Sequence, residues 1–158
     1  MSAESRTRNP FTASATGGRI LSALQLPLFA VRPPRSYGVL TTTGRKTGKT
    51  RRRCVRAVRS GDVAYLVAIK GGRTGWVRNA LANPQVRLRL RGGNFAGVAR
   101  EPQGAEMETA RAAYSEPVDL FEYLEFTMWR TGRPSRAAIR QLHREWFDQG
   151  IPLIVELR

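Results

Sequence analysis

Residues 41–53 (Thr-Thr-Thr-Gly-Arg-Lys-Thr-Gly-Lys-Thr-Arg-Arg-Arg) concentrate cations, hydroxyls and two glycines in one short segment. Gly44 and Gly48 allow a tight turn whose N–H groups could face a ligand, and the flanking side chains offer donors suited to phosphate or carboxylate. The segment is not the phosphate-binding loop of nucleotide triphosphatases, because three residues rather than four separate the glycines and a strand-like sequence follows. We expect an anion-binding hairpin, with a plain solvated hairpin as the alternative.

A second candidate segment ends a buried strand at 63–69. Lys70 and two glycines follow that strand, and Trp76 opens a short helix that Asn83-Pro84 stops. The main chain of such a strand end can lie along the edge of a flat ring, with Lys70 as a charged partner and Trp76 as an apolar wall. The two segments together predict a cleft for a ligand that is both aromatic and anionic.

The order and spacing of these motifs resemble the deazaflavin-dependent nitroreductase family, whose members are split β-barrels that bind coenzyme F420. The matching segments are T-T-x-G-R-K-T-G at 41–48, K-G-G at 70–72 and the Trp-to-Asn-Pro stretch at 76–84. The resemblance extends over about residues 37–100, with a weaker match at 151–156. It implies an enzyme that transfers a hydride from reduced F420 to a quinone, an activated alkene or a nitro compound.

The resemblance implies two groups of cofactor-binding residues. Those implied to hold the phosphate and the acidic oligoglutamate tail are Arg45, Lys46, Thr47, Gly48, Arg51 and Arg52. Those implied to line the deazaflavin or close over it are Val67, Ala68, Ile69, Lys70, Gly71, Gly75, Trp76, Val77, Arg78 and Asn79. Because the cofactor carries the hydride, we expect no catalytic triad and no metal. The candidate proton donors are Tyr65, Tyr114 and Tyr123.

The charge distribution agrees with a small, multiply anionic ligand. The 158-residue chain has a net charge of +15. Residues 1–100 contain 20 basic and two acidic residues, whereas residues 101–158 contain seven arginines and ten acidic residues. A positive half also suits nucleic acid or an anionic membrane. The alternatives to a reductase are therefore a non-catalytic carrier of F420 or flavin and a basic module that binds nucleic acid or a membrane surface.

The single cysteine and the single histidine exclude several other classes of site. Cys54 is the only cysteine and His143 the only histidine, which excludes an internal disulfide and metal sites built from several cysteines or histidines. We expect Cys54 to pack in a strand and His143 to lie at the surface or the edge of the core. A single cysteine also suits a reducing compartment.

The strands and helices expected from the sequence, which must position these residues, together predict an α+β, mainly β fold. We expect a split β-barrel of about six mostly antiparallel strands over 37–158, with a helical insertion at about 103–149. Alternating arginines at 86–91 predict a strand with one solvated cationic face. Residues 1–36 are expected to be a flexible segment with a short amphipathic helix that Pro27 ends or kinks.

The expected setting is cytoplasmic. No stretch approaches the roughly 20 apolar residues that cross a bilayer, although residues 19–31 are amphipathic enough for peripheral contact with the inner membrane face. The expected partner is a small-molecule hydride acceptor rather than a specific nucleic acid. The chain is expected to be a monomer or a homodimer.

Overall fold

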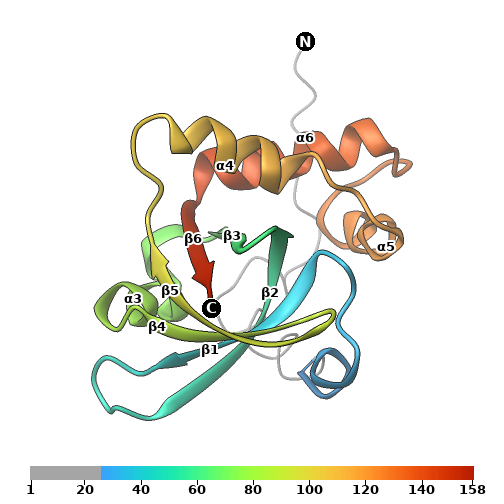
Figure 1. The fold of residues 1–158 in the computed structure, drawn as a ribbon. Coiled ribbons are helices and arrows are strands. Elements are labelled where there is room, and N and C mark those ends of the chain that lie inside the picture. Colours follow the sequence, from blue (N-terminus) through green and yellow to red (C-terminus); the bar gives the residue numbers. More distant parts are fainter. Residues whose placement is uncertain (1–25) are drawn as a thin grey trace.

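The structure is a computed structural model that describes residues 26–158, so the predictions made for residues 1–25 lie outside the described residues. Six strands close into a barrel in the order β1-β2-β3-β6-β5-β4, and every neighbouring pair is antiparallel (Figure 1). The strands are β1 (Tyr37–Thr43), β2 (Thr50–Ser60), β3 (Val63–Ala68), β4 (Gln85–Leu90), β5 (Gly93–Arg100) and β6 (Ile151–Leu157). The predicted fold class is thus confirmed.

The helices divide between two sides of the barrel. They are a 3-10 turn η1 (Gly71–Arg73), α3 (Gly75–Ala82), α4 (Glu106–Ser115), α5 (Leu120–Trp129) and α6 (Arg136–Gln149). In Figure 1, α4 and α6 run together across one side of the barrel with α5 beside them, while α3 lies on the other side. We refer to α4, α5 and α6 as the helical layer.

Strand alternation divides the apolar side chains between two cores. In β3, Ala64, Leu66 and Ala68 point into the barrel, whereas Tyr65 and Val67 point outward and pack beneath the helical layer. The side chains of α3 join the barrel interior and close one end of it. This helix is therefore held by the core rather than by its own propensity.

The helical layer approaches the barrel closely where α6 ends. A Cβ on Gly150 would lie 2.5 Å from Val67 Cγ1 and 2.7 Å from the carbonyl oxygen of Ala68, which is closer than any side chain tolerates. Glycine at this position lets the chain turn directly from α6 into β6. The contact also fixes the end of β3, which precedes the predicted ring-binding segment.

Residues 26–31 are helical, and Pro27 lies in the first described turn, where proline is tolerated; the helix predicted over residues 19–25 lies outside the described residues. Phe29 is buried, and its ring packs edge-on against Tyr37 and Phe121 at centroid distances of 5.8 and 5.7 Å. Arg89 Nε donates to the carbonyl oxygen of Ala30 at 3.2 Å at the end of this helix. These contacts hold the short helix against the barrel. Across residues 26–158, no helix is long and apolar enough to cross a membrane.

Candidate functional site

The loop between β1 and β2 is closed by its own glycines. The Gly44 N–H donates to the carbonyl oxygen of Lys49 and the Gly48 N–H donates to that of Gly44, both at 2.8 Å. Gly48 has φ +65°, a left-handed conformation that favours glycine. The N–H groups of the two glycines themselves are therefore used to close the turn.

The cations around this loop are exposed and unpaired. Lys46, Lys49, Arg51 and Arg52 are exposed, and within residues 26–158 none of their side chains has a hydrogen-bond or ion-pair partner. In register, Arg51 lies opposite Thr42 and Arg52 opposite Thr41, so the charges continue from the loop onto β2. We call these four side chains the hairpin cations. Four like charges without carboxylates form an anion-attracting surface.

A hydrogen bond joins the hairpin to α3. Asn79 Oδ1 accepts from both the main-chain N–H and the Nη1 of Arg45, each at 3.3 Å. Asn79 is buried, so α3 holds its side chain in place. Arg78, one residue earlier, donates from Nε to the carbonyl oxygen of Gly72 and attaches the preceding loop to the same helix. The two segments that the sequence singled out therefore meet.

Lys70 lies where β3 leads into this loop. Burial lowers the pKa of Lys70, and the positive charge of Arg53 on β2 lowers it further. An anionic ligand beside a partly desolvated lysine with a cationic neighbour would stabilise the charged form of that lysine. The positive charge of Lys70 at the end of β3 and that of Arg53 on β2 thus add to the electrostatic potential of the same part of the candidate site.

The side chains implied to line the ring differ in how far they can reach it. Val67 packs beneath the helical layer, Ala68 and Val77 lie in the barrel interior, and Ile69 is partly buried against the helical layer. Trp76, which was expected to form an apolar wall, packs in the barrel core with 9% of its surface exposed. The side chains of these residues are therefore engaged in packing within the two cores.

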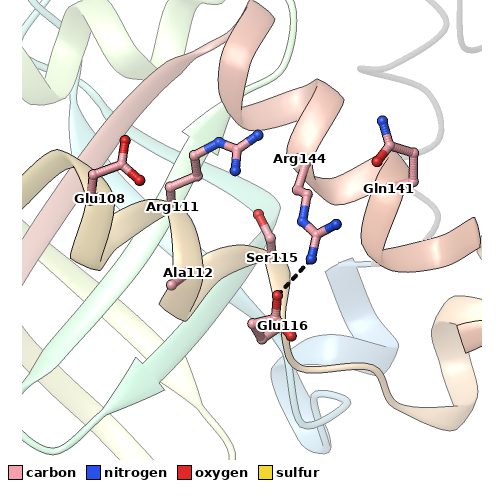
Figure 2. A pocket seen from close by; sticks show the side chains of 7 residues that line it. All are labelled: Glu108, Arg111, Ala112, Ser115, Glu116, Gln141 and Arg144. Carbon is pink, nitrogen blue, oxygen red and sulfur yellow. Dashed lines mark hydrogen bonds and ion pairs between the residues drawn. The ribbon is translucent and has the colours of Figure 1, made fainter. Parts of the chain in front are cut away.

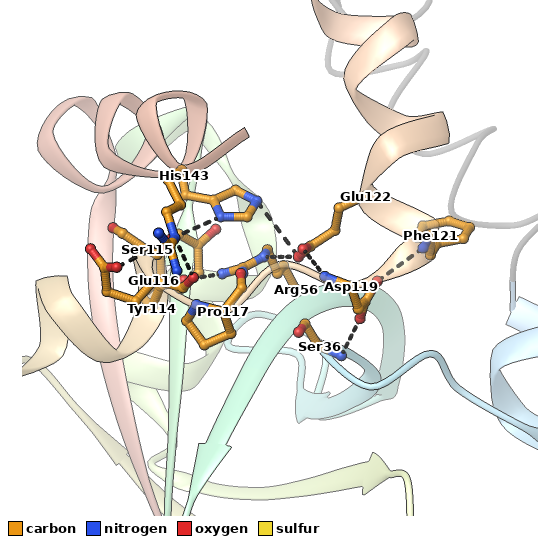
Figure 3. A network of polar contacts seen from close by, with 11 residues as sticks. Ser36, Arg56, Tyr114, Ser115, Glu116, Pro117, Asp119, Phe121, Glu122 and His143 are labelled. Atoms are coloured by element: carbon orange, nitrogen blue, oxygen red, sulfur yellow. Dashed lines mark hydrogen bonds and ion pairs between the residues drawn. The ribbon is translucent and has the colours of Figure 1, made fainter. Parts of the chain in front are cut away.

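Sequence reasoning missed a buried polar network further along β2, where the strand passes beneath the helical layer (Figure 3). Arg56 Nε contacts Glu122 Oε1 at 2.7 Å, with only 2% and 1% of these side chains exposed. Arg56 also donates from Nη2 to the carbonyl oxygen of Pro117 at 2.9 Å and from Nη1 to that of Tyr114. The available signal was an arginine inside the otherwise apolar stretch 54–58 of a strand.

His143 belongs to this network and is deeply buried, not placed at the surface or core edge as expected. Its Nδ1 lies 3.2 Å from the carbonyl oxygen of Ser115 and its Nε2 lies 3.6 Å from Glu122 Oε1. Burial and the charge of Arg56 lower the pKa of His143 to about 3. The ring is therefore neutral at physiological pH and does not serve as an acid there.

The three candidate tyrosines pack in the core beneath the helical layer. Tyr114 is fully buried, and burial raises the pKa of its hydroxyl to about 12. That hydroxyl has no hydrogen-bond partner in the described part of the chain. Tyr65 and Tyr123 are partly buried in the same cluster. The structure thus places Tyr114 in the Arg56 network and not beside the hairpin cations.

A pocket of about 350 Å³ lies in the helical layer, between α4 and α6 (Figure 2). Its two arginines are already paired: Arg144 with Glu116 at 2.8 Å and Arg111 with Asp148 at 2.8 Å. Because these carboxylates already neutralise the arginines, the pocket attracts an anionic ligand only weakly. The hairpin region is therefore the better candidate site.

Comparison with known proteins identifies a family for this chain. The family model described as F420H(2)-dependent quinone reductase matches residues 29–156. The F420H(2)-dependent quinone reductase Rv1261c of Mycobacterium tuberculosis is 36% identical over 76 residues, which cover 46% of this chain and 51% of that protein. The chain therefore spans about half the length of the curated relatives it matches.

Two solved structures share the fold. One, an F420-H2 dependent reductase (FDR-A), has a TM-score of 0.52 and 24% identity, and the alignment covers 78% of this chain and 95% of that one. The other, described as a domain-swapped dimer, has a TM-score of 0.50 and 26% identity, covering 78% and 81%. These matches support the barrel architecture along most of the chain.

Proposed function

Because the chain belongs to the F420H(2)-dependent quinone reductase family, we propose that it binds reduced coenzyme F420 and reduces a small electrophilic acceptor. The sequence resemblance to deazaflavin-dependent nitroreductases is confirmed at the level of the family. The observation that carries the proposal is the pair of hydrogen bonds from Arg45 to Asn79, which joins the unpaired hairpin cations to α3.

The residues present fit an anionic cofactor. A phosphate and several carboxylates require cations that are not already neutralised, and the hairpin cations meet that requirement. Lys70 and Arg53 add positive charge at the end of β3. We assign Lys46, Arg51 and Arg52 to the phosphate and the acidic tail, together with Arg45 and Thr47. Lys70, Gly71 and Gly75, with the main chain of residues 67–69, are assigned to the ring.

When bound, reduced F420 supplies the hydride. The chain's own residues bind the cofactor, orient it and exclude water. Asn79 fixes Arg45 relative to α3, and the packing of Trp76 and Val77 in the barrel core fixes α3 itself. A site built on elements held by a core keeps its geometry better than one on a free loop.

The acceptor class that we propose is a quinone, with activated alkenes and nitro compounds as further substrates. We propose a cytoplasmic enzyme that meets apolar acceptors at the inner membrane face through the segment at 19–31. The described end of that segment supports this, because Leu28 and Val31 are 65% and 77% exposed while Phe29 anchors the helix to the barrel. A monomer or a homodimer would each serve this role.

A titration with F420 tests the proposal. The variant Lys46→Ala/Arg51→Ala/Arg52→Ala removes three unpaired cations, and we expect affinity about 100-fold weaker than that of the parent protein. The matched control is Arg133→Ala/Arg158→Ala, whose side chains are also exposed and unpaired in the described part of the chain but lie before α6 and after β6, away from the hairpin. We expect the control to stay within about twofold.

The outcomes separate the alternatives. A flat titration accompanied by salt-dependent binding of DNA would support a nucleic-acid module and reject the reductase. Binding of reduced F420 with no turnover of a soluble naphthoquinone, an enone or a nitroaromatic would support the carrier. Regeneration of oxidised F420 by one of these acceptors, lost in the triple variant and kept in the control, would support the reductase.

A further inference from the structure

A second cationic region lies at the opposite end of β1 from the hairpin. It is an open groove of about 590 Å³ between the loop before β1, the β4–β5 turn, the segment before α5 and the start of α6. The lining residues are Pro34, Arg35, Ser36, Arg91, Pro117, Val118, Asp119, Leu120, Phe121 and Arg136. Segments separated by up to about a hundred positions thus meet here.

Three guanidinium groups line this groove without partners. Arg35, Arg91 and Arg136 are exposed, and in residues 26–158 none of them makes a hydrogen bond or an ion pair. Elsewhere on the helical layer, arginines such as Arg111 and Arg144 pair with carboxylates. The groove arginines therefore carry charge that the described part of the protein leaves uncompensated.

One carboxylate in the lining does not neutralise them. Asp119 accepts from the Phe121 N–H through Oδ1 at 3.0 Å and from the Ser36 N–H through Oδ2 at 3.1 Å (Figure 3). Both oxygens are thus committed to main-chain donors that cap α5 and hold the loop before β1. The three arginines outnumber this single acid, and the groove keeps a positive field.

The other lining is apolar. Leu120 is 87% exposed, and Phe121 is held rigid by edge-on packing against Tyr37 at 4.9 Å. Pro34, Pro117 and Val118 extend this wall. An exposed leucine beside unpaired arginines suits a ligand with an anionic head and an apolar body, because the arginines gain charge-assisted hydrogen bonds and the leucine leaves water.

The groove is separate from the proposed cofactor region. It adjoins residues 34–36 before Tyr37, whereas the hairpin follows Thr43 at the other end of β1. A strand of seven residues at about 3.3 Å each spans about 20 Å. A ligand in this groove would thus bind independently of F420.

We propose that this groove binds an anionic amphiphile, a phosphate or carboxylate attached to an alkyl or similarly apolar group. The three guanidinium groups hold the anionic head, and the wall around Leu120 packs against the apolar part. The same chemistry is available from a free amphiphile in solution and from an anionic lipid in a bilayer, and the test separates these two sources.

The test is calorimetric titration of the full-length protein with dodecyl phosphate below its micelle concentration. The variant Arg91→Gln/Arg136→Gln removes two groove cations, and Arg87→Gln/Arg133→Gln removes the same charge from nearby sites outside the groove lining. We expect about tenfold or greater weakening in the groove variant and less than about twofold in the control. Leu120→Ser, at an exposed site, should weaken dodecyl phosphate and leave inorganic phosphate unchanged.

Further ligands decide the chemistry and the source. Equal binding of dodecyltrimethylammonium, equal binding of inorganic phosphate, equal weakening by both double variants, or no saturable binding would overturn the proposal. Flotation with vesicles of phosphatidylcholine and phosphatidylglycerol, lost in the groove variant, would identify the lipid source. Saturable binding without flotation would identify the free amphiphile. None of these measurements involves F420, so their failure leaves the proposed reductase function untouched.

Discussion

Arginine has opposite environments in the two halves of β2. Arg51 and Arg52 are exposed and unpaired among the described residues, whereas Arg56, four positions further along, is buried against Glu122 and two carbonyl oxygens. The strand is continuous, and all three arginines lie in the part of it that pairs with β1. The difference comes from what covers the strand, since the helical layer lies over Arg56 whereas Arg51 and Arg52 lie at the exposed start of β2.

This comparison explains why one half is structural and the other is suited to binding. Burying a guanidinium group is costly unless its donors are satisfied, and Arg56 achieves this with a carboxylate, two carbonyls and the ring of Tyr114, 4.5 Å away. The hairpin arginines retain their water and their charge. Only they can exchange water for a ligand at small cost.

The largest expected effect comes from breaking the buried half. Arg56→Ala leaves the Glu122 carboxylate buried without its cation, and we expect a loss of about 3–5 kcal/mol in the free energy of unfolding. Urea denaturation followed by circular dichroism measures it. The double variant Arg56→Met/Glu122→Leu replaces the pair with apolar groups and should recover most of the loss. A small effect of Arg56→Ala would contradict this, because it would show that the Glu122 carboxylate does not depend on Arg56.

The next effect concerns pH. The pKa of His143 is about 3 in the folded protein, below its ordinary 6.5, because burial and Arg56 disfavour the charged ring. The unfolded chain therefore binds one more proton than the folded chain between these values, and folding stability falls as pH decreases through this window. The slope from this residue is about 1.4 kcal/mol per pH unit well below pH 6.5.

The variant His143→Gln isolates that slope while keeping an amide donor for the carbonyl of Ser115. The neighbouring groups are Glu122, Arg56 and Tyr114. Burial raises the pKa of Glu122, which opposes the histidine effect because its proton is retained in the folded state. Both proteins share that opposing contribution. The parent should therefore lose more stability than the variant between pH 6.5 and 5, and parallel curves would contradict the assignment of a neutral His143.

The outcome for β2 also shows how far sequence patterns reach. The hairpin, the short helix at 76–82 and the closing strand follow from glycines, prolines and alternation, which are local signals. The burial of Arg56 depends on Glu122, 66 positions away, and His143 becomes buried only when α6 packs over β3. Such long-range pairing has no local pattern, so neither the burial of Arg56 nor that of His143 was predicted from the sequence.

A smaller effect is expected where the helical layer joins the loop before β1. Asp119 caps α5 through the Phe121 N–H, and its own N–H donates to Glu122 Oε2 at 2.8 Å. Asp119→Ala removes this cap and the bond to Ser36, and we expect a loss of about 1–2 kcal/mol. Ser135→Ala, which removes only the cap of α6, is the matched control and should cost about 1 kcal/mol. Equal losses would mean that the bond to Ser36 contributes nothing.

The smallest expected effect sharpens the comparison from the exposed half. Arg51→Ala/Arg52→Ala removes two cations that touch no described partner, so the free energy of unfolding should change by less than about 0.5 kcal/mol. Because the removed charges repel Lys46 and Lys49, any change should be a stabilisation that fades with added salt. Denaturation at low and high ionic strength measures both features. A salt-independent loss would mean that these arginines are structural like Arg56, and the two halves of β2 would no longer differ in role.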